Sequence, residues 1–225
     1  MLLHIENLLD DATVERMRAK LDAAEWTDGQ ETVGPQGAQV KRNQQLPDSS
    51  PLRMELGREV LAACARHPEF HAATLPVSIL PPRFNRYANG GHYGAHIDGA
   101  VMALADGSQL RSDIACTLFL ADPESYDGGE LIIEDTWGEH EVKLPAGDAV
   151  VYPSSSLHRV APVTRGARVA AFFWIQSLVR DEARRRTLLQ LDTAIRELTA
   201  GAADPATVKQ LTGVYHNLLR QWAET

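Results

Sequence analysis

The chain has 225 residues, enough for one large domain or for one domain with an appendage. Its formal net charge of −8 argues against a nucleic-acid-binding surface, which needs a basic patch. The sequence has neither the stretch of roughly 20 apolar residues that spans a membrane nor the cationic start and apolar run of a secretory signal. It therefore predicts a cytoplasmic protein that binds neither nucleic acid nor membrane.

Residues 1–76 predict a support of helices and short strands. His4-Ile5 is typical of an opening strand, and Asp10 or Asp11 can cap a helix whose apolar side chains recur at helical spacing: Val14, Met17 and Leu21. Ser50-Pro51 combines a capping side chain with a proline at the first helical position. The buried face of this second helix is formed by Leu56, Val60, Leu61 and Cys64.

The segment Thr27–Pro47, between these helices, is rich in glycine and glutamine. This composition predicts a long loop or weakly paired strands. The segment could close over a site as a flap or be a plain surface excursion, and both interpretations stay open.

Residues 77–178 predict a core of short strands, after a change of character at His67-Pro68. Side chains alternate along Arg83–Tyr87, so that Arg83, Asn85 and Tyr87 share one face. Ile114–Leu120 is apolar enough for a central strand. Strands that recur about every 8 to 12 residues are typical of a sandwich or barrel. A nucleotide-binding fold is disfavoured because no glycine-rich phosphate loop follows a strand.

Residues 179–225 predict a C-terminal pair of helices, the second capped by Asp204-Pro205. The apolar stripes of the two helices are Leu188, Leu191, Ile195 and Leu198, and Val208, Leu211, Tyr215, Leu218 and Trp222. Stripes of this kind favour packing against the core over a homo-oligomeric surface, although the two are compatible. The run Arg184–Arg186 in the first helix is expected to be solvated.

Cys64 and Cys116 both lie in apolar surroundings. This setting indicates two buried thiols rather than a disulfide or a metal site.

The stretch Arg86–Gly99 has His96-Ile97-Asp98 at its centre. On an extended strand, side chains two residues apart leave the same face, so this segment can offer an imidazole nitrogen and a carboxylate oxygen to one ion. A second histidine from elsewhere in the fold would complete a set of two histidines and one carboxylate. That set suits non-haem Fe(II) and leaves positions open for O2 and an organic co-substrate.

The second histidine is predicted to be His158. A final hairpin is expected to join His158–Val163 to Arg168–Gln176 around Thr164-Arg165-Gly166, which would place His158 and Arg168 opposite each other, about 5 Å apart at Cβ. A guanidinium beside the metal suits a dicarboxylate that chelates iron through a keto-acid end. The planar fork of the guanidinium can bind the far carboxylate of such a ligand in bidentate fashion.

Together these motifs resemble the Fe(II)/2-oxoglutarate-dependent dioxygenases of the prolyl 4-hydroxylase type, and more closely the bacterial PKHD-type hydroxylases. The shared segments are His96-x-Asp98, His158, Arg168, Tyr87-x-x-Gly-x-x-Tyr93-x-x-His96, Arg83–Tyr87, Tyr126–Leu131, Ser155–Val160, Val163–Arg168 and Phe172–Gln176. The resemblance covers nearly the whole chain, including the helical tail. Prolyl 4-hydroxylases proper often carry Lys where this chain has Arg168, so substrates are not equated across the two groups.

The resemblance implies an α+β fold with a mainly β core: a double-stranded β-helix, or cupin-like jelly roll, with N-terminal helices and a C-terminal helical hairpin. It implies that His96, Asp98 and His158 are the catalytic Fe(II) ligands, that Arg168 binds the distal carboxylate of 2-oxoglutarate, and that Tyr87 donates a hydrogen bond to the same co-substrate. The expected reaction consumes O2, hydroxylates a peptide residue or a small molecule, and releases succinate and CO2. L-ascorbate is a candidate reductant.

Two other interpretations stay open. One is a cupin-like enzyme that uses zinc or iron without 2-oxoglutarate, which Arg168 disfavours; the other is a non-catalytic jelly-roll binding protein. His92 is a weak candidate for a further ligand, and surface or capping roles are expected for His4, His67, His71, His140 and His216. The segments Thr27–Pro47 and Met102–Arg111 are expected to shape the choice of substrate.

Overall fold

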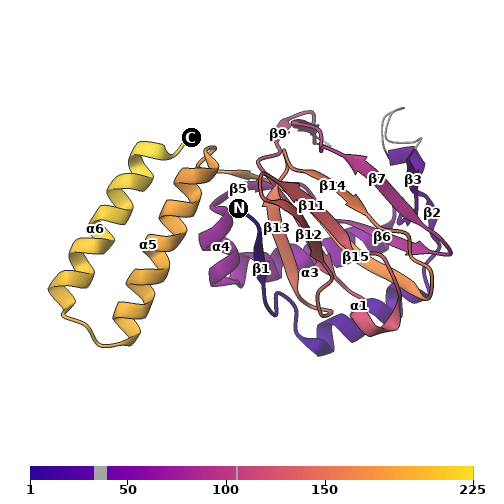
Figure 1. Ribbon diagram of the computed structural model, residues 1–225, viewed down its shortest axis with the longest axis horizontal. Coiled ribbons are helices and arrows are strands. Elements are labelled where there is room, and N and C mark those ends of the chain that lie inside the picture. The colour runs from indigo at the N-terminus through magenta and orange to yellow at the C-terminus, as the bar shows by residue number, and fades with distance from the viewer. Residues whose placement is uncertain (33–39, 105, 225) are drawn as a thin grey trace.

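The computed structural model describes residues 1–32, 40–104 and 106–224, and two antiparallel sheets form its body (Figure 1). The larger sheet runs in the order β1 (Leu3–Ile5), β13 (Ala149–Pro153), β10 (Ile114–Phe119), β15 (Ala167–Ser177), β6 (Arg83–Ala88), β4 (Gln44–Gln45) and β2 (Thr27–Asp28), and β5 (Pro76–Ile79) also pairs with β15. The smaller sheet runs in the order β12 (Gly138–Val142), β11 (Leu131–Asp135), β14 (Leu157–Val160), β7 (His92–His96) and β3 (Lys41–Arg42). A separate hairpin consists of β8 (Val101–Ala103) and β9 (Gln109–Arg111). Side chains from both large sheets enclose one cavity, so the predicted jelly roll is confirmed.

The strand β10 is the central strand that its apolar sequence predicted. All six of its residues are buried, and it pairs with β13 on one side and β15 on the other. A strand that is covered on both faces needs apolar side chains at nearly every position, and this explains why Ile114–Phe119 shows little polar alternation.

The helices α1 (Asp11–Asp22) and α3 (Pro51–Arg66) begin where their capping residues predicted, at Asp10 and Ser50. The expectation that strands follow His67-Pro68 directly was wrong, because α4 (Pro68–Thr74) comes first. His67 Nδ1 accepts the backbone N–H of Phe70 at 3.2 Å, and Pro68 suits the first helical turn, so the two residues start a helix instead of ending one.

The segment Thr27–Pro47 contains weakly paired strands, one of its two predicted forms. The two-residue strands β2 and β4 pair with each other, β4 pairs with β6, and β3 pairs with β7. The 3-10 helix η1 (Gly29–Thr32) follows β2. Residues 33–39 lie outside the described residues, so the flap stays a prediction.

The predicted final hairpin was wrong. β14 belongs to the smaller sheet, where it pairs with β11 and β7, whereas β15 belongs to the larger sheet, where it pairs with β10, β6 and β5. The chain crosses from one sheet to the other over residues 161–166 instead of folding back. His158 and Arg168 therefore face the cavity from opposite sheets.

The C-terminal helices α5 (Glu182–Ala200) and α6 (Pro205–Trp222) form the predicted hairpin. α5 packs beside α4, and Leu188 is buried with Leu75 and Val179. α6 lies on the outer side of α5 (Figure 1), and its described residues are all at least partly exposed. The expected packing is found where the hairpin meets this cluster, against which Tyr215, Leu218, Leu219 and Trp222 of α6 also pack.

Within the arginine run, Arg185 is not solvated as expected. Its side chain is 4% exposed, and its Nη1 donates to the carbonyl oxygens of Val179 and Arg180, both at 2.7 Å. Arg185 thus ties the start of α5 to the segment that leaves β15. No helix within the described ranges combines the length and apolar character that a bilayer crossing requires.

Gly128, in the turn before β11, is expected to resist substitution. Its φ is +73°, and a Cβ there would overlap the carbonyl oxygen of Pro162. Gly128→Ala should lower the free energy of unfolding by at least about 2 kcal/mol, through left-handed strain and a forced backbone shift. Gly107→Ala is the control, because Gly107 has φ +84° and a Cβ there would meet no described atom within 4 Å, and it should cost only about 1–2 kcal/mol. Urea unfolding measures both, and equal losses would contradict the overlap.

Candidate active site

One cavity of about 870 Å³ opens between the two sheets. Its wall includes the five side chains that the family resemblance assigned to metal or co-substrate binding: Tyr87, His96, Asp98, His158 and Arg168. These residues come from β6, from the end of β7 and the segment after it, from β14 and from β15. The fold thus brings together residues that lie up to 81 positions apart in the sequence.

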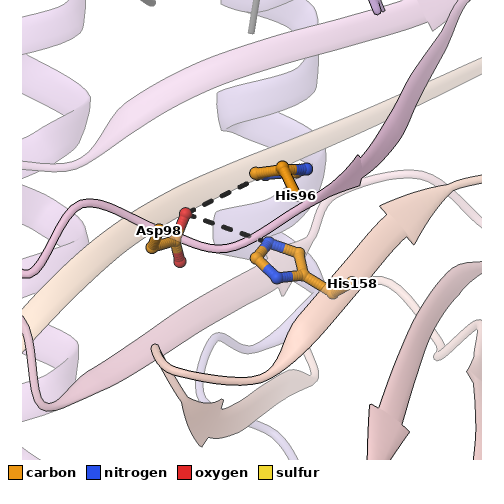
Figure 2. A group of neighbouring side chains, drawn as sticks. All are labelled: His96, Asp98 and His158. Atoms are coloured by element: carbon orange, nitrogen blue, oxygen red, sulfur yellow. Dashed lines mark ion pairs between the residues drawn. The ribbon is translucent and has the colours of Figure 1, made fainter. Parts of the chain in front are cut away.

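The pairing of β7 with β14 assembles the proposed metal trio. His96 is the register partner of His158 across this strand pair, and Asp98 follows two residues later. Figure 2 shows the Asp98 carboxylate directed at both imidazoles, with its Oδ1 3.9 Å from Nε2 of each histidine. These separations are too long for hydrogen bonds. The three ligand atoms lie within 4.8 Å of one another, a spacing that one ion could bridge.

In both histidines, a hydrogen bond at Nδ1, the nitrogen that faces away from the trio, fixes the orientation of the ring. His96 Nδ1 lies 2.8 Å from the carbonyl oxygen of Gly94, and His158 Nδ1 lies 3.0 Å from that of Ser156. A carbonyl only accepts, so each Nδ1 uses its proton in this hydrogen bond, and Nε2 of each ring is the nitrogen left for a metal. Two imidazole nitrogens and a carboxylate oxygen therefore converge, which fits a cation.

The electrostatics of the trio agree with this donor set. Burial, followed by the charge of His158, lowers the pKa of His96 from 6.5 to about 4, so this imidazole is neutral at pH 7. Burial raises the pKa of Asp98, and His158 and the Trp174 indole oppose that rise. Both effects are the desolvation of ionisable groups in a cavity wall.

Arg168 places a charged side chain at a buried position of the cavity wall, which is unfavourable in free energy. It is 1% exposed, and its guanidinium makes no ion pair or hydrogen bond with any residue that the structure describes. The guanidinium carbon lies 5.1 Å from the ring centroid of Phe119 and 5.5 Å from that of Tyr87. Cation–π contacts offset only part of the cost of burying a charge. The site therefore fits an anionic ligand.

Two tyrosines complete the inner wall. Tyr87 is the register partner of Arg168 and is 2% exposed, and burial raises its pKa, so it stays a protonated hydrogen-bond donor. Tyr93 stacks on His96 with 3.7 Å between ring centroids and 20° between the planes. Tyr93 thus lines the cavity directly beside one of the proposed metal ligands.

Sequence reasoning missed Trp174, which lines the cavity and whose Nε1 is buried with no hydrogen-bond partner among the described residues. The signal was present. Arg168 and Trp174 are six residues apart on β15, so strand alternation places them on the same face. Sequence reasoning also gave no role to Lys41, on β3, and Asn43, between β3 and β4, which both line the cavity.

The other histidines have structural roles or stay outside the trio. Among the described side chains His92 does not line the cavity, and its Nδ1 contacts the carbonyl oxygen of Gly90 at 3.0 Å. His4 pairs with Asp148 at 2.7 Å, and His140 pairs with Asp135 at 2.9 Å.

Comparison with known proteins agrees with this geometry. The family model described as the 2OG-Fe(II) oxygenase superfamily matches residues 82–176, and the model described as the PKHD-type hydroxylase C-terminal domain matches residues 182–224. A PKHD-type hydroxylase of Stenotrophomonas maltophilia (strain R551-3) is 65% identical over 224 residues, which cover 100% of both chains.

Two solved structures share the fold at low identity. A prolyl-4-hydroxylase of Pseudomonas putida has a TM-score of 0.52 and 22% identity, over 78% of this chain and 92% of that one. HygX from Streptomyces hygroscopicus, with nickel, 2-oxoglutarate and hygromycin B bound, has a TM-score of 0.53 and 16% identity, over 79% and 84% of the two chains. With the full-length relative and both family models, the conclusion is that the chain belongs to the PKHD-type hydroxylases, and it is thus an Fe(II)- and 2-oxoglutarate-dependent dioxygenase.

Proposed function

We propose that His96, Asp98 and His158 hold the iron of this dioxygenase, and that Arg168 binds the distal carboxylate of 2-oxoglutarate with Tyr87 as a further donor. One observation carries this assignment: three convergent acceptors share a cavity with a buried guanidinium that has no acidic partner among the described residues. The three acceptors lack a positive partner, and the guanidinium lacks a negative one among the described residues. A divalent cation and a dicarboxylate would supply these two charges.

The protein's own part in the reaction is binding and orientation. Bound iron supplies the activation of O2 that oxidises an unactivated C–H bond. The imidazoles of His96 and His158 and the carboxylate of Asp98 would hold it. The Arg168 fork fixes one end of the co-substrate, so that the keto-acid end is directed at the trio. The buried wall around Arg168 and Tyr87 excludes water from that end.

Anaerobic addition of Fe(II), followed by 2-oxoglutarate, tests the assignment. A weak visible charge-transfer band is expected in the wild-type protein, and it should be absent in His96→Ala. A cupin-like enzyme without 2-oxoglutarate would bind metal without the band, and a non-catalytic binding protein would show neither. Persistence of the band in His96→Ala would overturn the proposed ligand set.

Trp174→Phe is expected to weaken metal binding about 10- to 100-fold, the usual effect of losing an outer-shell partner. The indole lies beside the Asp98 carboxylate and favours its charged form, and phenylalanine keeps the ring while removing the N–H. Calorimetric titration of the apoenzyme with Mn(II) measures the change. Trp137→Phe is the matched control, because Trp137 is 91% exposed, and equal affinity in both variants would exclude a positioning role.

The substrate is proposed to be a peptide residue or a small molecule. The Pseudomonas putida neighbour is named a prolyl-4-hydroxylase, and HygX holds hygromycin B, so both kinds of substrate accompany this fold. A succinate-release screen of peptide and metabolite libraries, with Fe(II), 2-oxoglutarate and ascorbate, tests the two. Ascorbate is proposed as the reductant that keeps the iron ferrous.

The cellular location, the partners and the domain organisation of the protein are also proposed. Two buried free thiols, Cys64 and Cys116, support a cytoplasmic location. The net charge of −8 supports a protein that binds neither nucleic acid nor membrane. The exposed apolar side chains of Leu198 on α5 and Val214 on α6 support a homo-oligomer through the C-terminal helices. The division into residues 1–76, 77–178 and 179–225 is kept as the proposed organisation.

A further inference from the structure

A second cationic side chain lies on the same cavity wall as Arg168. β6 and β15 pair so that Tyr87 faces Arg168, Asn85 faces Ala170 and Arg83 faces Phe172. Arg83 and Asn85 line the cavity together with Tyr87. Exposure rises along this row, from 2% for Tyr87 and 7% for Asn85 to 25% for the Arg83 side chain. Arg83 therefore lies at the open end of the wall.

Arg83 is too far from the inner end to share the co-substrate. Four residues of strand separate it from Tyr87, which is about 13 Å at roughly 3.3 Å per residue. The four C–C bonds of 2-oxoglutarate, at about 1.5 Å each, span at most roughly 6 Å. The Arg83 guanidinium is also held at the rim, where its Nε and Nη2 donate to Asp48 at 3.1 and 2.8 Å.

The contact with Asp48 leaves part of the Arg83 fork available. Its Nη1 has no hydrogen-bond partner among the described residues, while Nε and Nη2 are both used. Arg53 shares the same carboxylate, with its Nε 3.5 Å from Asp48 Oδ1. Two guanidinium groups over one carboxylate leave about one unit of positive charge at the rim. Burial, followed by the charge of Arg83, lowers the pKa of nearby Lys41 to about 8, which places a further ammonium within the same positive field.

The rim is also apolar. Val40, Ile97 and Leu157 line the cavity although they are 38%, 60% and 37% exposed. Exposed apolar side chains that cluster at one opening indicate a binding surface, whereas single scattered ones do not. A ligand that satisfies both features has a hydrocarbon or aromatic body and an acidic group.

We propose that Arg83 is a specificity-determining residue, and that its free Nη1 edge binds a carboxylate of the substrate whose apolar body lies on Val40, Ile97 and Leu157. This inference rests on the proposed function, because the inner end must be filled by 2-oxoglutarate for the rim to be the substrate end. The carboxylate can belong to a small organic acid or to an acidic side chain of a peptide, and the test has one arm for each source.

The experiment uses the full chain loaded with Mn(II) and saturating 2-oxoglutarate. Paramagnetic broadening of ligand proton resonances measures the binding of two matched pairs. One pair is hexanoate and hexanamide; the other is a capped pentapeptide with a central glutamate between leucines and its glutamine analogue. At least one acid should bind more tightly than its amide. Arg83→Gln should weaken that acid about 10- to 100-fold and leave the amide unchanged, as expected for the loss of a hydrogen bond to a charged group.

Asp48→Asn separates recognition from a structural clamp. If Arg83 only ties β6 to the start of α3, Asp48→Asn and Arg83→Gln should weaken binding equally, and the proposal fails. Recognition by Arg83 instead predicts unchanged or tighter binding of the acid in Asp48→Asn. An equal affinity for acids and amides in both arms, or no binding of either acid, also overturns the proposal. Calorimetric binding of 2-oxoglutarate in the same samples distinguishes these failures from a failure of the proposed function, in which the co-substrate itself does not bind.

Discussion

His158→Ala is expected to abolish Fe(II) binding in the cavity and, with it, succinate release. The trio consists of two Nε2 lone pairs and one carboxylate oxygen, and removing one imidazole leaves a histidine and a carboxylate that cannot enclose the ion. The loss of affinity should exceed the roughly 10- to 100-fold effect of an outer-shell partner. Anaerobic calorimetric titration of Fe(II) into the apoenzyme gives the affinity directly.

The control for His158→Ala is His140→Ala. His140 pairs with Asp135, its side chain is 42% exposed, and it is not among the described residues that line the cavity. Its loss should leave Fe(II) affinity and turnover unchanged. Far-ultraviolet circular dichroism checks that both variants fold. A folded His158→Ala protein that binds Fe(II) as tightly as wild type would exclude His158 from the ligand set.

Arg168→Met is expected to have two opposite effects. The KM for 2-oxoglutarate should rise at least about 100-fold, because a bidentate, charge-assisted contact is lost. The apoenzyme should at the same time become more stable, by about 1–4 kcal/mol in the free energy of unfolding, because an uncompensated buried charge is replaced by an apolar side chain. A residue that merely packs in the core would lower stability and leave the KM for 2-oxoglutarate intact.

Thermal unfolding of the apoenzyme measures the change in stability. Thermal unfolding of the metal-loaded protein with and without 2-oxoglutarate measures whether the co-substrate still binds. The metal-loaded wild type should gain stability when 2-oxoglutarate is added, since a ligand that binds only the folded state raises the melting temperature. Arg168→Met should show no such gain. Arg159→Met is the matched control, because Arg159 pairs with Glu139 at the surface, with both hydrogen bonds at 2.7 Å. A gain with 2-oxoglutarate in Arg168→Met equal to that of wild type would contradict the assignment.

The sequence was most informative where the signal is local. Capping residues placed the starts of α1 and α3 at Asp10 and Ser50, and alternation put Arg83, Asn85 and Tyr87 on one face, which is the face that lines the cavity. These predictions depend on neighbours only a few positions apart. The same reasoning failed after His67-Pro68, where strands were expected and α4 comes first, with Pro68 in its first turn.

Long-range pairing could not be obtained from the sequence in this way. The segment from His158 to Arg168 has the length and the turn residues of a hairpin, and only the partners of each strand show that the chain crosses between sheets. His158 is opposite His96 because β14 pairs with β7, a register that no local pattern contains. The convergence of trio and guanidinium was predicted from the expected hairpin, which was wrong, and from the family resemblance, and not from this strand pairing.

The position of the two histidines on facing strands has a mechanical consequence for the apoenzyme. An ion shared by His96 and His158 closes a loop of the chain between them and clamps β7 to β14, where the register is already irregular beside His158. Closing a long loop removes entropy from the unfolded chain, as a cross-link does. Removal of the ion by a chelator should therefore loosen the pairing of β7 with β14 first. The backbone amides of these two strands should then exchange with solvent before those of β10.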